Sequence, residues 1–173
     1  MRKVEVQPYN DQWITKFEEE AVQLQNVFGS QIQKIHHIGS TAVKGLQAKP
    51  IIDMMIEVHD INLIITYHAQ MIAIGYKPKG ENGIDKRRYF QKGGDNRTHH
   101  VHIFEIGSPD IVRHLAFRDY LRTHGDIAKM YGDFKERLSR SFPFDSKSYG
   151  KHKDPLVKVI ERQALEWYRK MNG

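Results

Sequence analysis

The sequence predicts an α+β protein in which a mixed sheet of about four or five strands packs against helices, with a helical C-terminal third. Three observations predict this class. Strand-like runs occur at 32–38, 51–58, 86–91 and 98–105. Segments with helical spacing of apolar residues lie between these runs. The chain after residue 105 carries helix signals alone.

The composition predicts one domain over residues 1–173, with enough chain for one good core. No run approaches ~18 apolar residues, so no membrane span is expected. The N-terminus lacks the apolar core of a signal peptide, and we expect a cytoplasmic protein. Cysteine is absent, which excludes disulfides and thiolate metal sites. The oligomeric state is left open.

The charge balance suits an anionic ligand. Lysine and arginine number 27 against 21 aspartate and glutamate residues, for a net charge of +6. A phosphorylated small molecule, a nucleotide or RNA would match that excess. No dense basic tract supports RNA in particular, and a merely basic surface explains the excess equally well.

The first half of the chain is predicted to contain a short strand, a helix, two further strands and a second helix. Residues 4–6 form a short predicted strand, and Asn10 or Asp11 caps a helix that ends at Gly29. The strand at 32–38 runs into a Gly-Ser turn, and the strand at 51–58 follows. Next, Asp60 caps a helix that Gly75 closes.

The second half begins with a hairpin that joins 86–91 to 98–105 through a glycine-rich turn. Ser108-Pro109 then starts a helix, because proline suits the first helical turn. Gly125 breaks this helix, and it restarts at once and runs to about Ser139. Residues 142–150 are loop-like, and Asp154-Pro155 opens the last helix.

The turn at Gly39-Ser40-Thr41 is the first candidate binding element. Backbone N–H groups in such a turn can hold a phosphate, and the two hydroxyl groups can donate hydrogen bonds. Asp53 follows within the next strand, where it can hold the metal ion that accompanies a phosphate. The alternative is a plain strand end, because Gly-Ser ends many strands.

Residues 37–58, HIGSTAVKGLQAKPIIDMMIEV, resemble the GrpB-like family, a largely uncharacterised group with a nucleotidyltransferase-like fold. The resemblance continues through PYNDQW (8–13), RRYF (87–90), THHVHIFEIGSP (98–109) and RHLAFRDYLRTH (113–124), and so covers nearly the whole chain. It implies the fold and a nucleotide ligand. Arg118 and Lys153 match positions of the family motifs.

One position departs from catalytic members of the nucleotidyltransferase superfamily, which place a second carboxylate two residues after the first. This chain has Met55 there. Glu57 cannot replace it, because four residues at ~3.3 Å each put it about 13 Å from Asp53. The departure argues against two-metal phosphoryl chemistry of the usual kind.

His100 and His102 offer a different metal site. Alternation along the strand puts both, about 6.6 Å apart, on the face that Asp53 and Phe104 share, and we expect an open cleft along this face. Two imidazoles and a carboxylate suit Zn²⁺, Fe²⁺ or Mn²⁺ better than Mg²⁺. The alternative is that these histidines form hydrogen bonds or contact a phosphate. The sequence therefore predicts a divalent metal, with Mg, Mn or Zn left open.

Four basic residues are candidate phosphate ligands. Lys49 precedes a proline, which favours extended backbone near the Asp53 strand. Of two neighbouring arginines that alternate on their strand, we assign Arg88 to the cleft. Arg118 could instead pair with Asp119 to hold a helix, and Lys153 could lie exposed before the last helix.

Three functions follow. The first is a nucleotidyltransferase-like enzyme in which Asp53 holds the metal and the Gly-Ser turn holds the phosphates. The second is a binding module without transfer chemistry, linked to nucleotides or coenzyme A, since similar domains resemble a segment fused to dephospho-CoA kinase. The third is a His/Asp metal-dependent phosphohydrolase. Fold alone does not choose among them.

Overall fold

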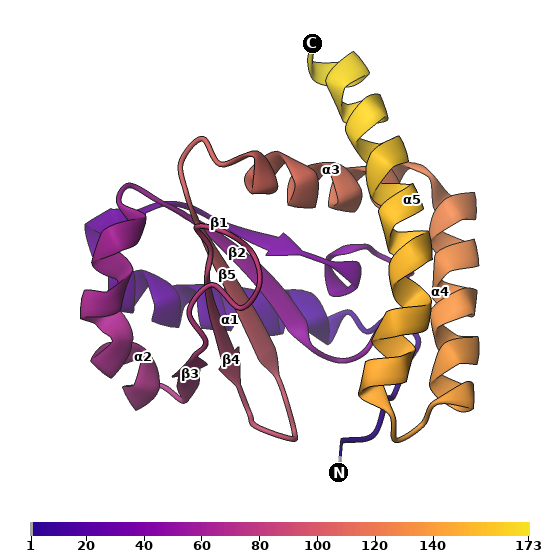
Figure 1. Ribbon diagram of the computed structural model, residues 1–173, viewed down its shortest axis with the longest axis horizontal. Helices are drawn as coiled ribbons and strands as arrows, with labels where there is room; N and C mark the ends of the chain where they lie inside the picture. The colour runs from indigo at the N-terminus through magenta and orange to yellow at the C-terminus, as the bar shows by residue number, and fades with distance from the viewer. Residues whose placement is uncertain (1) are drawn as a thin grey trace.

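A computed structural model describes residues 2–173 and confirms the mixed α+β fold (Figure 1). The sheet has five strands in the order β1-β2-β5-β4-β3. Their bounds are β1 Ile32–Ile38, β2 Ile52–Val58, β3 Tyr76–Pro78, β4 Arg88–Lys92 and β5 His99–Glu105. The central pair β2 and β5 is parallel, and the other neighbours are antiparallel.

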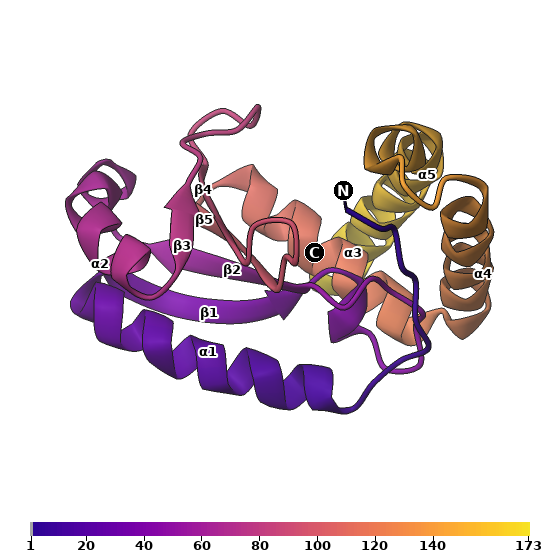
Figure 2. The ribbon, with the colours of Figure 1, turned by 90° about the horizontal axis from the view of Figure 1, so that it is seen from below.

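Helices cover both faces of the sheet. Their bounds are α1 Gln12–Phe28, α2 His68–Ala73, α3 Pro109–Thr123, α4 Gly125–Ser141 and α5 Ser146–Asn172. Figure 2 shows α1 along one face and α3 on the other, with α4 and α5 beyond one end of the sheet. Within the described part of the chain, no helix is long and apolar enough to cross a membrane.

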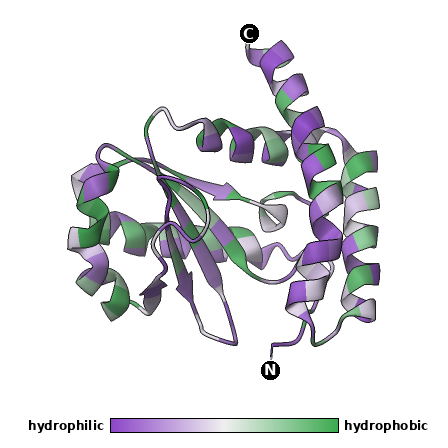
Figure 3. Ribbon diagram, in the orientation of Figure 1, coloured by the Kyte–Doolittle hydropathy of each residue, from purple (hydrophilic) through white to green (hydrophobic). Residues whose placement is uncertain are grey.

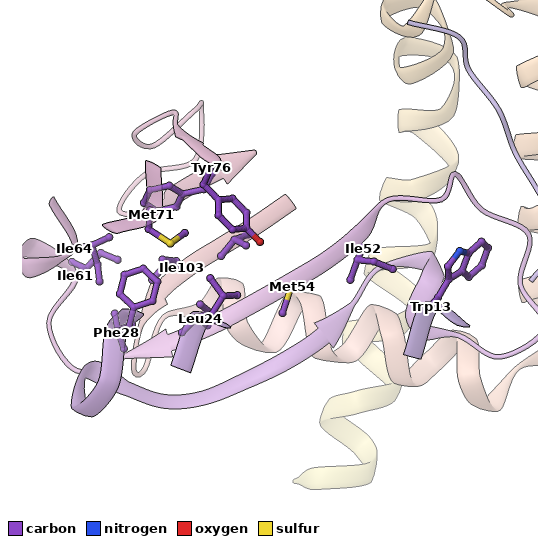
Figure 4. Packing of buried hydrophobic residues seen from close by; sticks show 14 of the residues in the cluster. Trp13, Leu24, Phe28, Ile52, Met54, Ile61, Ile64, Met71, Tyr76 and Ile103 are labelled. Carbon is purple, nitrogen blue, oxygen red and sulfur yellow. The ribbon is translucent and has the colours of Figure 1, made fainter. Parts of the chain in front are cut away.

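The larger core lies between the sheet and α1. Met54 and Ile56 of β2 and Ile103 of β5 point into it, as their alternation predicts. They pack against Leu24 and Phe28 of α1 (Figure 4). Each of these side chains is almost wholly buried, so this core fixes which face of β2 and β5 turns away from α1.

A smaller core covers part of the opposite face. Ile38, Met55 and Phe104 pack against Ile111 of α3. The prediction of an open cleft along this whole face is therefore wrong for Phe104, which is buried. Asp53, near the start of β2 on the same face, stays partly exposed.

The C-terminal helices form a third cluster, with Ala116 and Leu121 of α3 packed against Ile160 of α5. Val43 and Leu46, from the loop between β1 and β2, also belong to this cluster. That loop therefore ties the Gly-Ser turn to the helical end of the molecule. Figure 3 shows hydrophobic and hydrophilic residues alternating along α4 and α5, as expected for helices with one packed side.

Two elements of the N-terminal half differ between the prediction and the structure. The strand at 4–6 is wrong: Gln7 forms one isolated bridge to Ala48, and Val4 N–H donates to the Pro143 carbonyl at 2.8 Å. The helix after Asp60 begins as a 3₁₀ segment, Ile61–Tyr67, and only then becomes α2. The short β3 was not predicted, because three residues carry too little periodicity.

The last helix begins earlier than predicted. Asp145 accepts a hydrogen bond from Ser148 N–H at 3.0 Å and caps α5, so the expected loop at 142–150 is largely helical. Pro155 lies inside the helix instead of in its first turn. As a result, Tyr149 and Lys153 are helical residues one turn apart on the same side.

Met55 provides a test of this packing. Met55→Asp restores the carboxylate that the wider superfamily has, but places it, uncompensated, in the core under α3. We expect a loss of about 3–5 kcal/mol in the free energy of unfolding, against less than about 1.5 for Met55→Leu. Urea unfolding at pH 7 measures both. Equal stabilities for the two variants would contradict the packing described.

Candidate functional site

Asp53 lies at the start of β2, opposite Ile38 of β1 and beside His100 of β5. Gly39 follows β1 with a φ of +70°. A Cβ atom built on Gly39 would lie 2.9 Å from Asp53 Oδ2. Glycine is thus required here both for the backbone conformation and for the room that the Asp53 carboxylate occupies.

Two histidines hold the carboxylate. His102 Nε2 lies 3.1 Å and His100 Nδ1 lies 3.4 Å from Asp53 Oδ1. Burial alone would raise the pKa of Asp53, but the hydrogen bonds from His100 and His102 outweigh it and hold that pKa well below its usual range. Asp53 is therefore a carboxylate at any physiological pH.

Arg87 determines the tautomer of His102. Arg87 NH1 lies 3.2 Å from His102 Nδ1, and a guanidinium can only donate. His102 Nδ1 therefore accepts, and the ring proton sits on Nε2, from which it is donated to Asp53. Burial also lowers the pKa of His102, which favours this neutral form. Arg87, His102 and Asp53 thus form one directed chain of hydrogen bonds.

The assignment of Arg88 to the cleft is wrong, and its neighbour Arg87 takes that place. Arg88 pairs with Ile103, whose side chain faces the α1 core, and donates to the Arg87 carbonyl at 3.0 Å. Arg87 lies just before β4, is 6% exposed, and stacks over Tyr89. Neighbouring residues of a strand face opposite sides of the sheet, so only one of the two arginines can face Asp53. The sequence alone did not show which one it is.

The predicted metal ligands come together but do not fit a three-ligand site. His102 uses both ring nitrogens, one with Arg87 and one as a donor to Asp53, so neither has a lone pair for a metal ion. In residues 2–173, no group of three or more His, Asp or Glu side chains is arranged to hold one. Asp53 Oδ2 is the acceptor that the two histidines leave free.

Three lysines converge on the same carboxylate. Lys49 from the loop before β2, Lys135 from α4 and Lys153 from α5 line a pocket of about 170 Å³ together with Asp53 and Ser40. We call it the lysine pocket. Lys135 is 3% exposed, and its Nζ donates to Ser40 Oγ at 2.7 Å. The Gly-Ser turn is thus joined to a buried lysine amino group.

Burial lowers the pKa of each lysine. The pKa of Lys49 falls to about 8, with the positive charges of Lys153 and Arg2 adding to the effect of burial. That of Lys135 falls well below its ordinary value through burial and the charges of Lys153 and Lys49. Burial likewise lowers the pKa of Lys153, although Asp53 opposes it. One carboxylate thus faces three lysine side chains whose protonated form burial disfavours and a bound anion would stabilise.

Arg118 supports the turn from behind, whereas Thr41 lines the lysine pocket beside Ser40. Thr41 is buried, and its Oγ1 lies 2.9 Å from His37 Nε2. Arg118 donates to the His37 carbonyl at 3.2 Å and pairs with Asp119 at 2.8 Å. This arrangement matches the ion-pair alternative for Arg118, which lines neither pocket beside Asp53.

Lys135 is a site residue that the sequence interpretation missed. It occupies the apolar side of α4, in line with Ala128 and Tyr131. A lysine at a position where the helical pattern requires an apolar residue is the signal that could have found it. Arg87 was missed for a different reason, because the sequence does not show which of Arg87 and Arg88 faces Asp53.

A second pocket, of about 260 Å³, lies on the other side of Asp53. We call it the aromatic pocket, after Phe117 of α3 and Tyr131 of α4. Arg113 of α3 and Glu161 of α5 also line it. Ser40, Asp53 and Lys153 line both pockets, which therefore meet at the carboxylate.

A basic groove continues outward from the lysine pocket. Arg2, Lys16 and Arg97 line it, and it shares Arg2 and Lys49 with the lysine pocket. Arg97 and Arg2 each contribute to lowering the pKa of Lys49, which shows that these charges act together. The positive surface is thus assembled from distant segments, which explains why no basic tract marks it in the sequence.

A family model described as "GrpB protein" matches residues 3–163. The UPF0157 protein YqkA of Bacillus subtilis (strain 168) is 52% identical over 172 residues, covering 99% of this chain and 50% of that protein. The chain therefore spans about half the length of this curated relative.

Two solved structures share the fold. Conserved protein GrpB from Enterococcus faecalis matches with a TM-score of 0.91 and 42% identity, over 95% of this chain and 99% of that chain. A structure of Cid1, described with its RNA terminal uridylyl transferase activity, matches with a TM-score of 0.53 and 10% identity, over 75% of this chain and 41% of that chain. The second likeness confirms the predicted nucleotidyltransferase-like fold.

The contact between Gly39 and Asp53 can be measured. Gly39→Ala combines a positive φ, worth about 1–3 kcal/mol of strain, with a methyl group against the carboxylate. Gly45→Ala is the matched control, because Gly45 has a φ of +84° and no neighbour within 4 Å of a built Cβ. We expect Gly39→Ala to lower the unfolding free energy more. Placing Asp53→Ala in the same chain should remove the excess; if it persists, Asp53 is not its cause.

Proposed function

The chain belongs to the GrpB family, and we propose that it binds the phosphate groups of a nucleotide between the Gly39-Ser40 turn and the lysine pocket. The observation that carries this proposal is the convergence of Lys49, Lys135 and Lys153 on one carboxylate. The donor from Lys135 to Ser40 supports it, because a phosphate placed at the turn would meet a buried ammonium group.

The charge balance favours an anion with several charges. Burying an ammonium group without a partner is costly, and the lowered pKa values of the three lysines express that cost. Asp53 already accepts from two histidines. A di- or triphosphate would supply the missing negative charge and several hydrogen-bond acceptors.

Nucleotidyl transfer is the reaction class that we propose for this site, by analogy with the fold that it shares with Cid1. Lys49, Lys135 and Lys153 would stabilise the charge that develops on the phosphates. Asp53 Oδ2 is the group to receive a divalent cation that arrives with the phosphates, as Mg²⁺ commonly does. The basic groove is where an anionic acceptor such as RNA would approach.

A binding module without transfer chemistry is the second candidate, and Met55 favours it. Met55 is buried under α3, on the side of β2 where the wider superfamily carries its second carboxylate. A His/Asp metal hydrolase is less well supported, because the proton on His102 Nε2 points at Asp53. Both of the first two candidates require the site to bind the phosphate groups of a nucleotide.

The first test removes one ammonium group. Lys135→Met keeps the alkyl chain, and we expect the affinity for inorganic triphosphate to fall about tenfold to hundredfold, as for a lost hydrogen bond to a charged group. Lys129→Met is the control, because Lys129 lies exposed on the same helix. Isothermal titration calorimetry with Mg²⁺ and with EDTA also tests for a cation at Asp53. Unchanged binding in Lys135→Met would reject the proposal.

The second test uses pH. Because the pKa of Lys49 is about 8, its ammonium group loses its proton as the pH rises from 7 to 9. An anion binds the protonated form, so affinity should fall over that range. Lys49→Arg stays charged, because a guanidinium has a pKa above about 12, and should show a shallower fall. The ligand's own titration is the same for both proteins, so parallel pH profiles would exclude Lys49 from the phosphate site.

A further inference from the structure

We infer that the aromatic pocket is the nucleobase subsite of this nucleotide site, and that it selects guanine over uracil. The inference rests on the proposed function, because it takes the phosphates to lie in the lysine pocket. The two pockets share Ser40, Asp53 and Lys153. A ligand with phosphates at Ser40 can therefore extend past Asp53 without leaving the protein.

The walls of the aromatic pocket suit a flat ring. Phe117 and Tyr131 meet edge to face, with ring centroids 6.0 Å apart and planes at 88°. Val157 of α5 adds an apolar contact. Aromatic and aliphatic walls of this kind bind a planar, weakly polar group such as a nucleobase.

Two charged side chains give the pocket a polar edge. Arg113 NH1 and Glu161 Oε2 are 3.6 Å apart, which is longer than a hydrogen bond. Arg113 also donates to Asp110 at 3.2 Å, which holds its guanidinium in place. Glu161 therefore keeps carboxylate oxygens able to accept from a ligand. The edge offers an acceptor and a donor side by side.

Guanine complements that edge best. It presents two parallel N–H groups, on N1 and N2, which a carboxylate can accept together, and O6 beside them can accept from an arginine. Adenine and cytosine each offer one amino group to Glu161. Uracil presents one N–H between two carbonyl oxygens, which would repel the carboxylate. Glu161 is half-buried, and a site whose acceptor is shielded from water disfavours a base that cannot donate to it.

The experiment measures GDP, ADP, CDP, UDP and inorganic pyrophosphate against the unmodified chain by isothermal titration calorimetry. We expect GDP to bind most tightly, at least about tenfold tighter than UDP, which is the effect of one well-placed hydrogen bond to a charged group. Glu161→Gln should remove most of the GDP preference, because an amide offers one acceptor and adds donors. Glu166→Gln, at an exposed position of the same helix, should keep it.

The outcomes separate the two proposals. If pyrophosphate and all four nucleotides bind with equal affinity, the base subsite is wrong and the phosphate site stands. If UDP binds as tightly as GDP, or Glu161→Gln leaves the preference unchanged, the assignment of the edge is overturned. If neither pyrophosphate nor any nucleotide binds, the proposed function fails, and this inference fails with it.

Discussion

The Asp53 carboxylate is the interaction on which the rest of the site depends. It lies between a chain of donors from Arg87 through His102 on one side and the lysine pocket on the other. Each of those groups is a donor, and Asp53 is the one carboxylate that they share. The fold reserves space for it by placing Gly39, whose missing side chain would otherwise collide with it. One charge in β2 thus organises residues from both strands and helices.

The excess of basic side chains around Asp53 is unfavourable for the stability of the fold. Lys135 is almost fully buried, donates to Ser40 and faces other cations, which a sequence selected for stability alone would avoid. Sites that break the rules of core composition are commonly those that bind or react. The Glu20 cluster on the α1 side is a useful contrast, since there a buried carboxylate is matched by Tyr76 and Lys92 within 3.0 Å.

Strand periodicity predicted more of the site than any motif did. Alternation in β2 and β5 placed Asp53, His100 and His102 on one face, and the structure brings them together. Periodicity could not separate Arg87 from Arg88, because β4 begins at that point and the phase is set by pairing with β5. It could not find Lys135, which reaches Ser40 across 95 residues of sequence.

The early start of α5 is another feature of the site that the sequence interpretation missed. Taken as a loop and a later helix, residues 142–150 gave Tyr149 and Lys153 no common orientation. In the continuous helix, Tyr149, Lys153, Val157 and Glu161 recur every four residues and line the two pockets in turn. The helix starts early because Asp145 caps it. The sequence interpretation placed the start at Pro155 instead, because proline usually marks the beginning of a helix.

The buried Met55 and the three lysines have one electrostatic explanation. In two-metal sites, several carboxylates hold metal ions, and the ions present positive charge to the phosphates. If the site binds phosphates as proposed, lysines would present positive charge directly, and a second carboxylate beside Asp53 would cancel part of that charge. Met55 can then serve the small core under α3. The positive charge that Lys49 supplies depends on pH, because an ammonium group with a pKa of about 8 is charged only while it keeps its proton.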